Sequence, residues 1–493
     1  MGEFLAIWAE IEPRTQERRG RLGKWAAGAW IEIALCFVAV FGLGSTLLGD
    51  FQKVREFDYV ATDYKTLYAS SALYREGGNP YDAPALMAIY HRDGVVLPRT
   101  TFGRMPVYPP PTLLVLWPLT YLPMGASADA WWVVSMAVTA AALAMLVGEA
   151  RRQGLNWLYR LGLIAFTVAS PMLGYTFNIG NVSPTVGALC TIALMLAVRE
   201  SQAGAKAGTT AWLTAGGCLG LALCLKPHMA VWIAAGIALV GGRSGRRIAA
   251  VGVALFGGCT VLSMALVWSR GALHMVLGSF LAMLAQERAS GSMSAESREL
   301  LPVLGQLTGL DSLLGLHVGQ PLQGWLVGAA LAACFGVLLV MAWRRRWWSR
   351  DPAWQALYVT AIFATGMLAS YHRAHDAVLL AGLDGLWICH AIREARRDGR
   401  RRWLYAGASA VILCIFGGQW FALPSWICER AATSFHAPWL ADLLALRQGA
   451  AVAACLAVVL IVLVDVTGKL QKKTARTVYC PCREASDATC VGR

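Results

Sequence analysis

Residues able to do acid–base chemistry occur at a few isolated places in an otherwise apolar chain. Asp63 lies in a polar tract over residues 62–82, and Lys226 stands between two apolar runs in LALCLKPHMAVWIAA. A third group fills a five-residue turn and consists of His372, Arg373, His375 and Asp376. A carboxylate opposed by cations can act as a general base while the cations hold a departing phosphate.

The turn at 372–376 allows a second chemistry, because two histidines and a carboxylate could ligate a metal. Their spacing is not diagnostic of a metal site, so phosphate binding is favoured over metal binding and no metal is assigned. The histidines could also orient the substrate or the base. A hydrogen-bonded loop cluster without a catalytic role is the remaining interpretation of this turn.

Asp63 and Lys226 also have structural interpretations. The tract that begins at Thr62 can form a helix that Gly77 and Gly78 end, and a carboxylate in its first turn would interact favourably with the helix dipole. One side of this helix would carry Tyr64, Leu67, Tyr68, Ser71 and Ala72. The helix could therefore lie flat on a membrane, with its aromatic residues against lipid or protein. Lys226 could extend its ammonium group to the membrane interface, where Pro227 breaks the helix.

Composition indicates the class of protein that positions these residues. Of 493 residues, 57% are hydrophobic and only 15% are charged, which is typical of a polytopic α-helical membrane protein. The first apolar run, residues 28–49, has no evident cleavage site behind it and is expected to remain as an anchor. The net charge of +14 is concentrated in short loops, so it indicates topology rather than nucleic-acid binding.

Twelve spans can be placed, near residues 28–49, 127–148, 157–174, 181–198, 210–225, 228–242, 248–268, 323–343, 354–371, 375–391, 403–421 and 447–466. Arg and Lys follow every even-numbered span, as Arg151 and Arg243 illustrate, so both termini are predicted to be cytoplasmic. A cytoplasmic segment over 1–26 then precedes a membrane domain over 27–466. A basic tail over 467–493 contains Cys480, Cys482 and Cys490, which could bind metal or carry lipid.

Two long loops, residues 50–126 and 269–322, would face outside. TLLVLWPL at 112–119 is too short to cross and is expected to be re-entrant or interfacial. A further amphipathic piece is expected near 271–285. On this topology all the unusual polar residues share the external face, and ionisable residues at membrane depth persist mainly where they pair or line a functional cavity.

Several motifs in order together resemble glycosyltransferase family 87, a family of the GT-C superfamily. They are the tract from Thr62 to Asp82, YPPP at 108–111, PLTYLP at 118–123, IGN at 179–181, LKP at 225–227 and H-x-x-H-D at 372–376. The resemblance extends over roughly residues 25–425. Two positions depart from the family pattern: Asn181 stands where Gln is frequent, and Ser183 stands where Asn is common.

The resemblance implies a multi-span helical fold with external loops that carry interfacial helices, and a catalytic Asp early in the first loop. Asp63 matches that position, and Asp58 is the reserve. The implied activity is inverting transfer of a sugar, expected to be mannose, from a polyprenyl-phosphate donor to a lipid or glycan acceptor. The expected location is a bacterial plasma membrane with the active site outside. Membrane lipids, the donor and the acceptor are the expected partners, without nucleic acid and without a cofactor.

The resemblance also assigns binding roles. The donor phosphate would be bound by Lys226, His228, His372, Arg373 and His375. Contacts to the sugar or acceptor would come from Tyr64, Tyr68, Asn79, Tyr81, Tyr108, Asn181 and Asp376. Two alternatives remain open: a lipid or sugar transporter or flippase, and the same chemistry with an arabinofuranosyl or another pentose or hexose donor.

Overall fold

The structure is a computed structural model that describes residues 62–93, 108–155, 179–203, 209–289, 320–344, 352–369, 383–386 and 457–464, with a few isolated residues between 157 and 177. Every regular element within these residues is a helix, and no strand occurs among them. The predicted all-α class is therefore confirmed for the described part of the chain. The count of twelve spans and the cytoplasmic termini stay predictions, and the spans expected at 28–49 and 403–421 lie outside the described residues.

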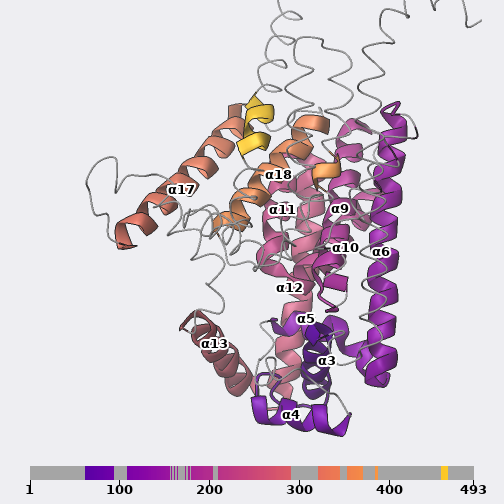
Figure 1. Cartoon of the computed structure of the whole chain (residues 1–493), viewed down its shortest axis with the longest axis vertical. Coiled ribbons are helices and arrows are strands. Elements are labelled where there is room, and N and C mark those ends of the chain that lie inside the picture. Colours follow the sequence, from indigo (N-terminus) through magenta and orange to yellow (C-terminus); the bar gives the residue numbers. More distant parts are fainter. Residues whose placement is uncertain are drawn as a thin grey trace, which may run out of the picture.

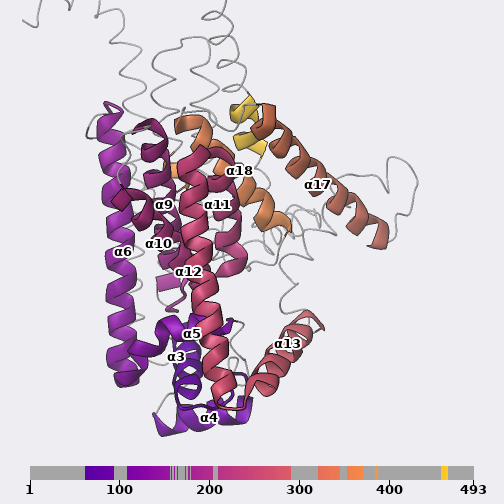
Figure 2. The same ribbon diagram turned by 180° about the vertical axis from the view of Figure 1, so that it is seen from behind.

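The longer helices form an elongated bundle (Figures 1 and 2). Its members are α6 (Met124–Arg152), α9 (Ser183–Ala203), α10 (Thr209–Leu225), α11 (Pro227–Val240), α12 (Gly242–Ser269) and α18 (Pro352–Ala369), and α17 (Gln320–Arg344) packs on α18. Among the described helices, α6, α12 and nearly all of α9 are long and apolar enough to cross a membrane. The apolar stretch of α9 is mostly buried, whereas most residues in those of α6 and α12 are partly or fully exposed. The outer helices thus present apolar side chains to the surroundings, as lipid-facing helices do.

Glycines set how α10 packs against α12. A Cβ atom on Gly216 would lie 2.6 Å from Val251 Cβ, and one on Gly220 would lie 2.8 Å from Leu255 Cβ. Because the residue numbers rise together along both helices, α10 and α12 run parallel, and α11 returns between them. The turn from α10 to α11, which carries Lys226, therefore points toward the same end of the bundle as the last residues of α12.

Shorter helices gather at this end of the bundle (Figures 1 and 2). They are α3 (Thr62–Arg75), α4 (Ala83–Arg92), α5 (Pro110–Leu116) and the 3-10 helix η3 (Trp117–Tyr121). The apolar stretch at 112–119 thus forms two short helices that do not span, as predicted. The helix expected near 271–285 is α13 (Leu273–Ala289), which leads away from the bundle after α12.

The helix that begins at Thr62 does not lie flat on a surface, so this part of the sequence-based expectation is wrong. Residues 64–74 of α3 are buried without exception. Protein surrounds α3 on all sides, because it contacts α4, α5, α6 and η3. Its polar residues Ser70 and Ser71 are as inaccessible as its tyrosines. A hydrophobic stripe of three or four residues could not distinguish a helix on a membrane from one enclosed by helices supplied elsewhere in the chain.

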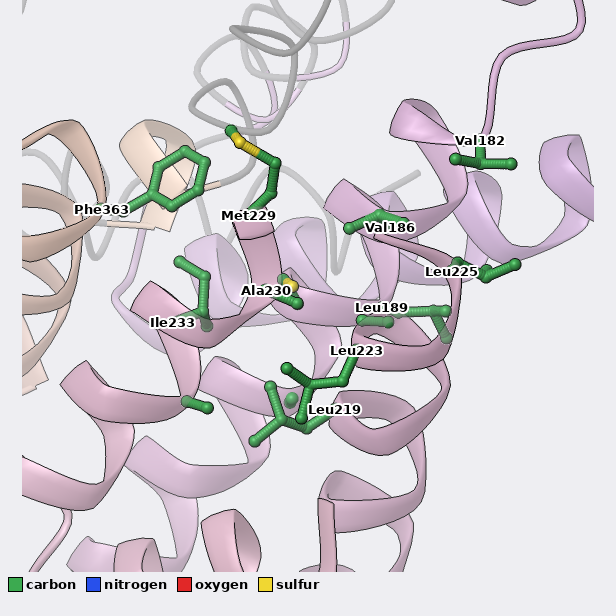
Figure 3. Packing of buried hydrophobic residues seen from close by; sticks show 14 of the residues in the cluster. Val182, Val186, Leu189, Leu219, Leu223, Leu225, Met229, Ala230, Ile233 and Phe363 are labelled. Atoms are coloured by element: carbon green, nitrogen blue, oxygen red, sulfur yellow. The ribbon is translucent and has the colours of Figure 1, made fainter. Parts of the chain in front are cut away.

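The core behind the turn at Lys226 is built from four helices. Figure 3 shows side chains from α9, α10, α11 and α18 directed toward one another, among them Leu189, Leu223, Ile233 and Phe363. All four side chains are buried. This packing fixes the start of α9 against the turn between α10 and α11, which are the two places where polar residues enter the site described below.

Basic residues mark the opposite end of the bundle. Arg152 at the end of α6 and Arg199 near the end of α9 both approach Glu149, Arg199 at 4.0 Å. Arg243 and Arg246 follow the turn from α11 into α12 at this same end. Exposed indole rings, Trp157 and Trp343, accompany the basic residues. Basic and aromatic residues of this kind are enriched where a membrane protein meets the headgroup region.

Candidate active site

Asp63 lies at the beginning of α3, where two backbone hydrogen bonds hold it against a distant turn. The amides of Asp63 and Tyr64 donate to the Ile179 carbonyl at 2.9 and 3.3 Å. Gly180 follows with a φ of 66°, a left-handed conformation that glycine adopts without a steric penalty. The glycine lets the chain reverse just before Asn181, so that this asparagine faces the first turn of α3.

A polar bridge leads from the Asp63 carboxylate into the protein. Asn181 Nδ2 donates to Asp63 Oδ2 at 2.7 Å. Asn181 Oδ1 accepts two hydrogen bonds from Ser183, one from its amide at 2.8 Å and one from its hydroxyl at 2.6 Å. Asn181 and Ser183 are buried, whereas Asp63 is partly exposed. The bridge therefore joins a partly accessible carboxylate to the protein interior.

The bridge ends on Lys226. Its ammonium Nζ donates to Ser183 Oγ at 2.8 Å. Lys226 occupies the single-residue break between α10 and α11, and Pro227 begins α11, where a residue without an amide hydrogen costs nothing. The Lys226 side chain is only 5% exposed, so it does not extend to a surface, and the snorkelling interpretation is wrong. The carboxylate and the ammonium that the sequence singled out are thus linked by two neutral side chains.

Helix α5 supports the turn that carries Lys226. The buried Thr112 hydroxyl donates to the Cys224 carbonyl at 2.7 Å, which satisfies one of the carbonyls left open at the end of α10. Thr112 follows the YPPP tract, whose prolines fix the entry into α5. Thr112, directly after this tract, therefore supports the site through the backbone of α10.

Tyr64 and Trp131 brace the two segments that carry Asp63 and Asn181. The rings stack with centroids 5.9 Å apart, and Trp131 Nε1 donates to the Gly180 carbonyl at 3.2 Å. The Tyr64 hydroxyl shares a hydrogen bond of 2.6 Å with Ser127. Burial raises the pKa of Tyr64 well above its ordinary value, so the phenol stays neutral. A single indole ring therefore touches both sides of the Asp63–Asn181 contact.

The short helices α3, α4, α5 and η3 at this end of the bundle form what we call the end subdomain. Within the described residues, the other side chains predicted to contact sugar or acceptor make hydrogen bonds that hold it together. Tyr68 donates to the Leu122 carbonyl at 2.9 Å, and Tyr81 donates to the Tyr108 carbonyl at 2.7 Å. Asn79 donates to Ser279 of α13 at 2.8 Å. The structure therefore brings these residues to the same end of the bundle as Asp63, with their polar atoms engaged in protein contacts.

His228 lies exposed in the first turn of α11, two residues after Lys226. Asp58 and the turn containing His372, Arg373, His375 and Asp376 lie outside the described residues. Their predicted roles stay predictions. Helix α18, which precedes that turn, runs antiparallel to α11, because Gly236 meets Val359 and Gly366 meets Trp232. It therefore ends at Ala369 on the side of the bundle that carries Lys226.

The sequence model of glycosyltransferase family 87 matches residues 107–370, which is more than half of the chain. The chain belongs to glycosyltransferase family 87. No curated protein and no solved structure matches it. As a member of family 87 with apolar helices of spanning length, it is a membrane glycosyltransferase.

The matched region of this family-87 protein contains Asn181, Ser183 and Lys226, while Asp63 precedes it. The structure joins the two parts, because the contact of Asp63 with Asn181 crosses 118 residues of sequence. Sequence analysis missed Ser183 as a site residue, and it also missed Trp131. A usable signal was present for Ser183, since Asn-x-Ser-Pro is a pattern in which the asparagine side chain accepts from the backbone at the start of a helix.

Proposed function

We propose that this family-87 enzyme transfers a sugar, expected to be mannose, from a polyprenyl-phosphate donor, with Asp63 as the general base. Asp63 removes the proton from an acceptor hydroxyl, and the resulting oxygen forms a bond to the anomeric carbon. The bond from that carbon to the phosphate oxygen breaks on the opposite face, so the configuration inverts. Polyprenyl phosphate leaves with the bonding electron pair, and the proton remains on Asp63 until it passes to solvent.

The observation that carries this proposal is the pairing of a partly exposed carboxylate with a buried ammonium through Asn181 and Ser183. The hydrogen bond from Asn181 engages one oxygen of Asp63, and the other oxygen is the proposed proton acceptor. Lys226 supplies a fixed positive charge for the phosphate that departs. Arg373, with His372 or His375, is proposed to add to that charge.

Replacement of Asp63 by Asn tests the base. General-base assistance is worth roughly 10²- to 10⁴-fold in rate, and Asp63→Asn should lower turnover by about that factor while expression and donor binding are retained. The measurement is transfer of radiolabelled mannose from polyprenyl-phosphate-mannose into lipid by purified protein in membranes. Asp129→Asn is the matched control, because Asp129 is an exposed carboxylate on α6 at the same end of the bundle.

Near wild-type turnover of Asp63→Asn would remove Asp63 from this role and bring Asp58 forward. If wild-type protein transfers no mannose, the same assay with arabinofuranosyl and glucosyl donors tests the sugar. Failure with every polyprenyl donor, together with movement of the lipid across the bilayer, would overturn the proposed transfer reaction and favour a transport function.

A further inference from the structure

We propose that Asn181 and Ser183 are positioning residues that hold the base and the phosphate-binding cation in one fixed arrangement. The inference rests on the proposed function for the roles of Asp63 and Lys226. It assigns to Asn181 a role different from the sugar contact expected from sequence, and it adds Ser183, which the resemblance left without a role.

The orientation of the Asn181 amide is determined by its partners. Oδ1 accepts from the Ser183 amide and hydroxyl at 2.8 and 2.6 Å, and only the oxygen of the amide can accept from these donors. Nδ2 must then face Asp63, which it reaches at 2.7 Å. A reversed amide would place an N–H group against the Ser183 backbone amide and the amide oxygen against the Asp63 carboxylate, which is costly for buried groups.

The Ser183 hydroxyl connects the Lys226 ammonium to the neutral Asn181 side chain, and the direction of both hydrogen bonds is fixed. The hydroxyl donates a hydrogen bond to Asn181 Oδ1 and accepts one from the Lys226 ammonium at 2.8 Å. The side chain is fully buried at the start of α9. Because these hydrogen bonds lie in series, displacement of Lys226 disturbs the Asn181 amide and hence the carboxylate of Asp63.

A neutral bridge suits this position better than direct contact. A direct ion pair between Asp63 and Lys226 would satisfy the ammonium with the base itself and reduce the basicity of the carboxylate. Two intervening neutral residues separate the charges and still fix the distance between them. The carboxylate keeps one oxygen for the acceptor hydroxyl, and the ammonium is not neutralised by the base.

Two substitutions interrupt the bridge at different points. Ser183→Ala removes the shared hydroxyl, and Asn181→Leu removes the donor to Asp63. Each should lower kcat by about 10- to 100-fold, the worth of a hydrogen bond to a charged group, while KM for the donor changes less than threefold. Thr185→Val is the matched control. Thr185 lies two residues after Ser183 on α9, and its buried hydroxyl donates to Ser135 at 2.8 Å, outside the bridge. The control should leave kcat unchanged.

A structural role alone predicts a different pattern. If Ser183 only stabilised the fold, Ser183→Ala and Asp63→Asn would lower kcat independently and their effects would multiply. On the proposed arrangement, Ser183→Ala has little further effect once Asp63 is replaced by Asn. Ser183→Thr, which keeps the hydroxyl, should restore more than half of the wild-type kcat. Multiplying effects, or failure of Ser183→Thr to exceed Ser183→Ala, would overturn the inference.

A measurement without substrate separates this inference from the proposed reaction. Thermal unfolding of Asp63→Leu, Lys226→Met and the double variant in detergent should give a combined fall in Tm smaller than the sum of the single falls. The pair Asp63→Leu and Thr185→Val should be additive. Additive falls for the first pair would exclude the bridge whatever the enzyme transfers. If Lys226→Met does not fold, Ser183→Ala replaces it in the same cycle.

Discussion

The side chain of Tyr74, near the end of α3, is buried and binds a helix that follows much later in the chain. The Tyr74 hydroxyl donates to the Ser263 carbonyl of α12 at 2.7 Å. Burial raises the pKa of Tyr74 to about 12 from its ordinary value of 10.0. The folded state therefore keeps this proton at a pH where the unfolded chain has lost it.

This difference predicts how stability depends on alkaline pH. The contribution of Tyr74 is fully present below pH 10 and is lost as the pH rises toward 12. Thermal unfolding in detergent should show the Tm of the wild type falling over this interval. The Tm of Tyr74→Phe should start lower, because a hydrogen bond worth about 1 kcal/mol is lost. It should then decrease less steeply with pH, because the titrating phenol is absent. Tyr121→Phe is the control, since Tyr121 is exposed. An unchanged slope in Tyr74→Phe would contradict the prediction.

Asp63, Lys226 and Asn181 of the candidate site could be predicted from sequence, whereas the bridging role of Asn181 and the presence of Ser183 could not. Asp63 and Lys226 stand out because ionisable residues are rare in an apolar chain, so their presence alone requires an explanation. Asn181 and Ser183 are common in turns and helix starts, where they need no special reason. Their role depends on a contact across 118 residues, which a single sequence does not reveal.

At the level of helices, the close approach of α10 to α12 depends on the glycines between them. A Cβ atom on Gly220 would lie 2.7 Å from Leu255 Cδ2 and 3.0 Å from the Gly252 carbonyl oxygen. Small residues at such contacts let helix backbones approach closely in membrane proteins. The interface positions the turn that carries Lys226, so its packing matters to the site.

Two glycines on α10, three residues apart, should respond to alanine in opposite directions. Gly220→Ala should lower Tm, since forcing a methyl group into a filled contact costs about 1–3 kcal/mol. Gly217→Ala should raise or maintain Tm, because nothing lies within 4 Å of its added Cβ and alanine is the better helix former. Unfolding of both variants in detergent is the measurement. Equal effects would show that the contact with α12 does not limit stability.

The helices themselves were largely predictable, whereas the surroundings of the short ones were not. The apolar runs expected near 127–148 and 248–268 lie within α6 and α12, and the run near 181–198 overlaps α9 from Ser183 onward. A helix is the structure expected for long apolar stretches in lipid, because it satisfies every backbone polar group internally. Helix α3 was expected at a surface and is buried. Its partners α5 and η3 are themselves too short for their placement to follow from hydropathy.

For the whole molecule, the candidate site and the basic residues lie at opposite ends of the bundle. Asp63 and Lys226 are linked through Asn181 and Ser183 at one end, and Arg152 and Arg199 approach Glu149 at the other. Exposed aromatic rings occur near both ends, with Tyr121 and Trp268 on the side of the site and Trp157 and Trp343 on the basic side. The arrangement favours a membrane between the two ends.

Labelling of single cysteines tests which side each end faces. His91→Cys on α4 and Arg246→Cys on α12 both replace exposed residues. A membrane-impermeant maleimide should modify the first in intact cells and the second only after permeabilisation, because Arg and Lys accumulate on the cytoplasmic side. Wild-type protein gives the background from native thiols. The reverse pattern would invert the predicted topology, and labelling of both in intact cells would exclude a membrane between the ends.

Three hydrogen bonds of the end subdomain are made with residues that are translated much later. Asp63 binds Asn181, Tyr74 binds Ser263 and Asn79 binds Ser279, across 118, 189 and 200 residues. Such distant contacts form late, since the intervening chain must first be in place. Helices α3 and α4 therefore complete their contacts only after the ribosome has synthesised α9 to α13. A nascent chain released before α12 would already contain Asp63 and Asn181, but it would lack the Ser263 carbonyl that binds Tyr74 near the other end of α3.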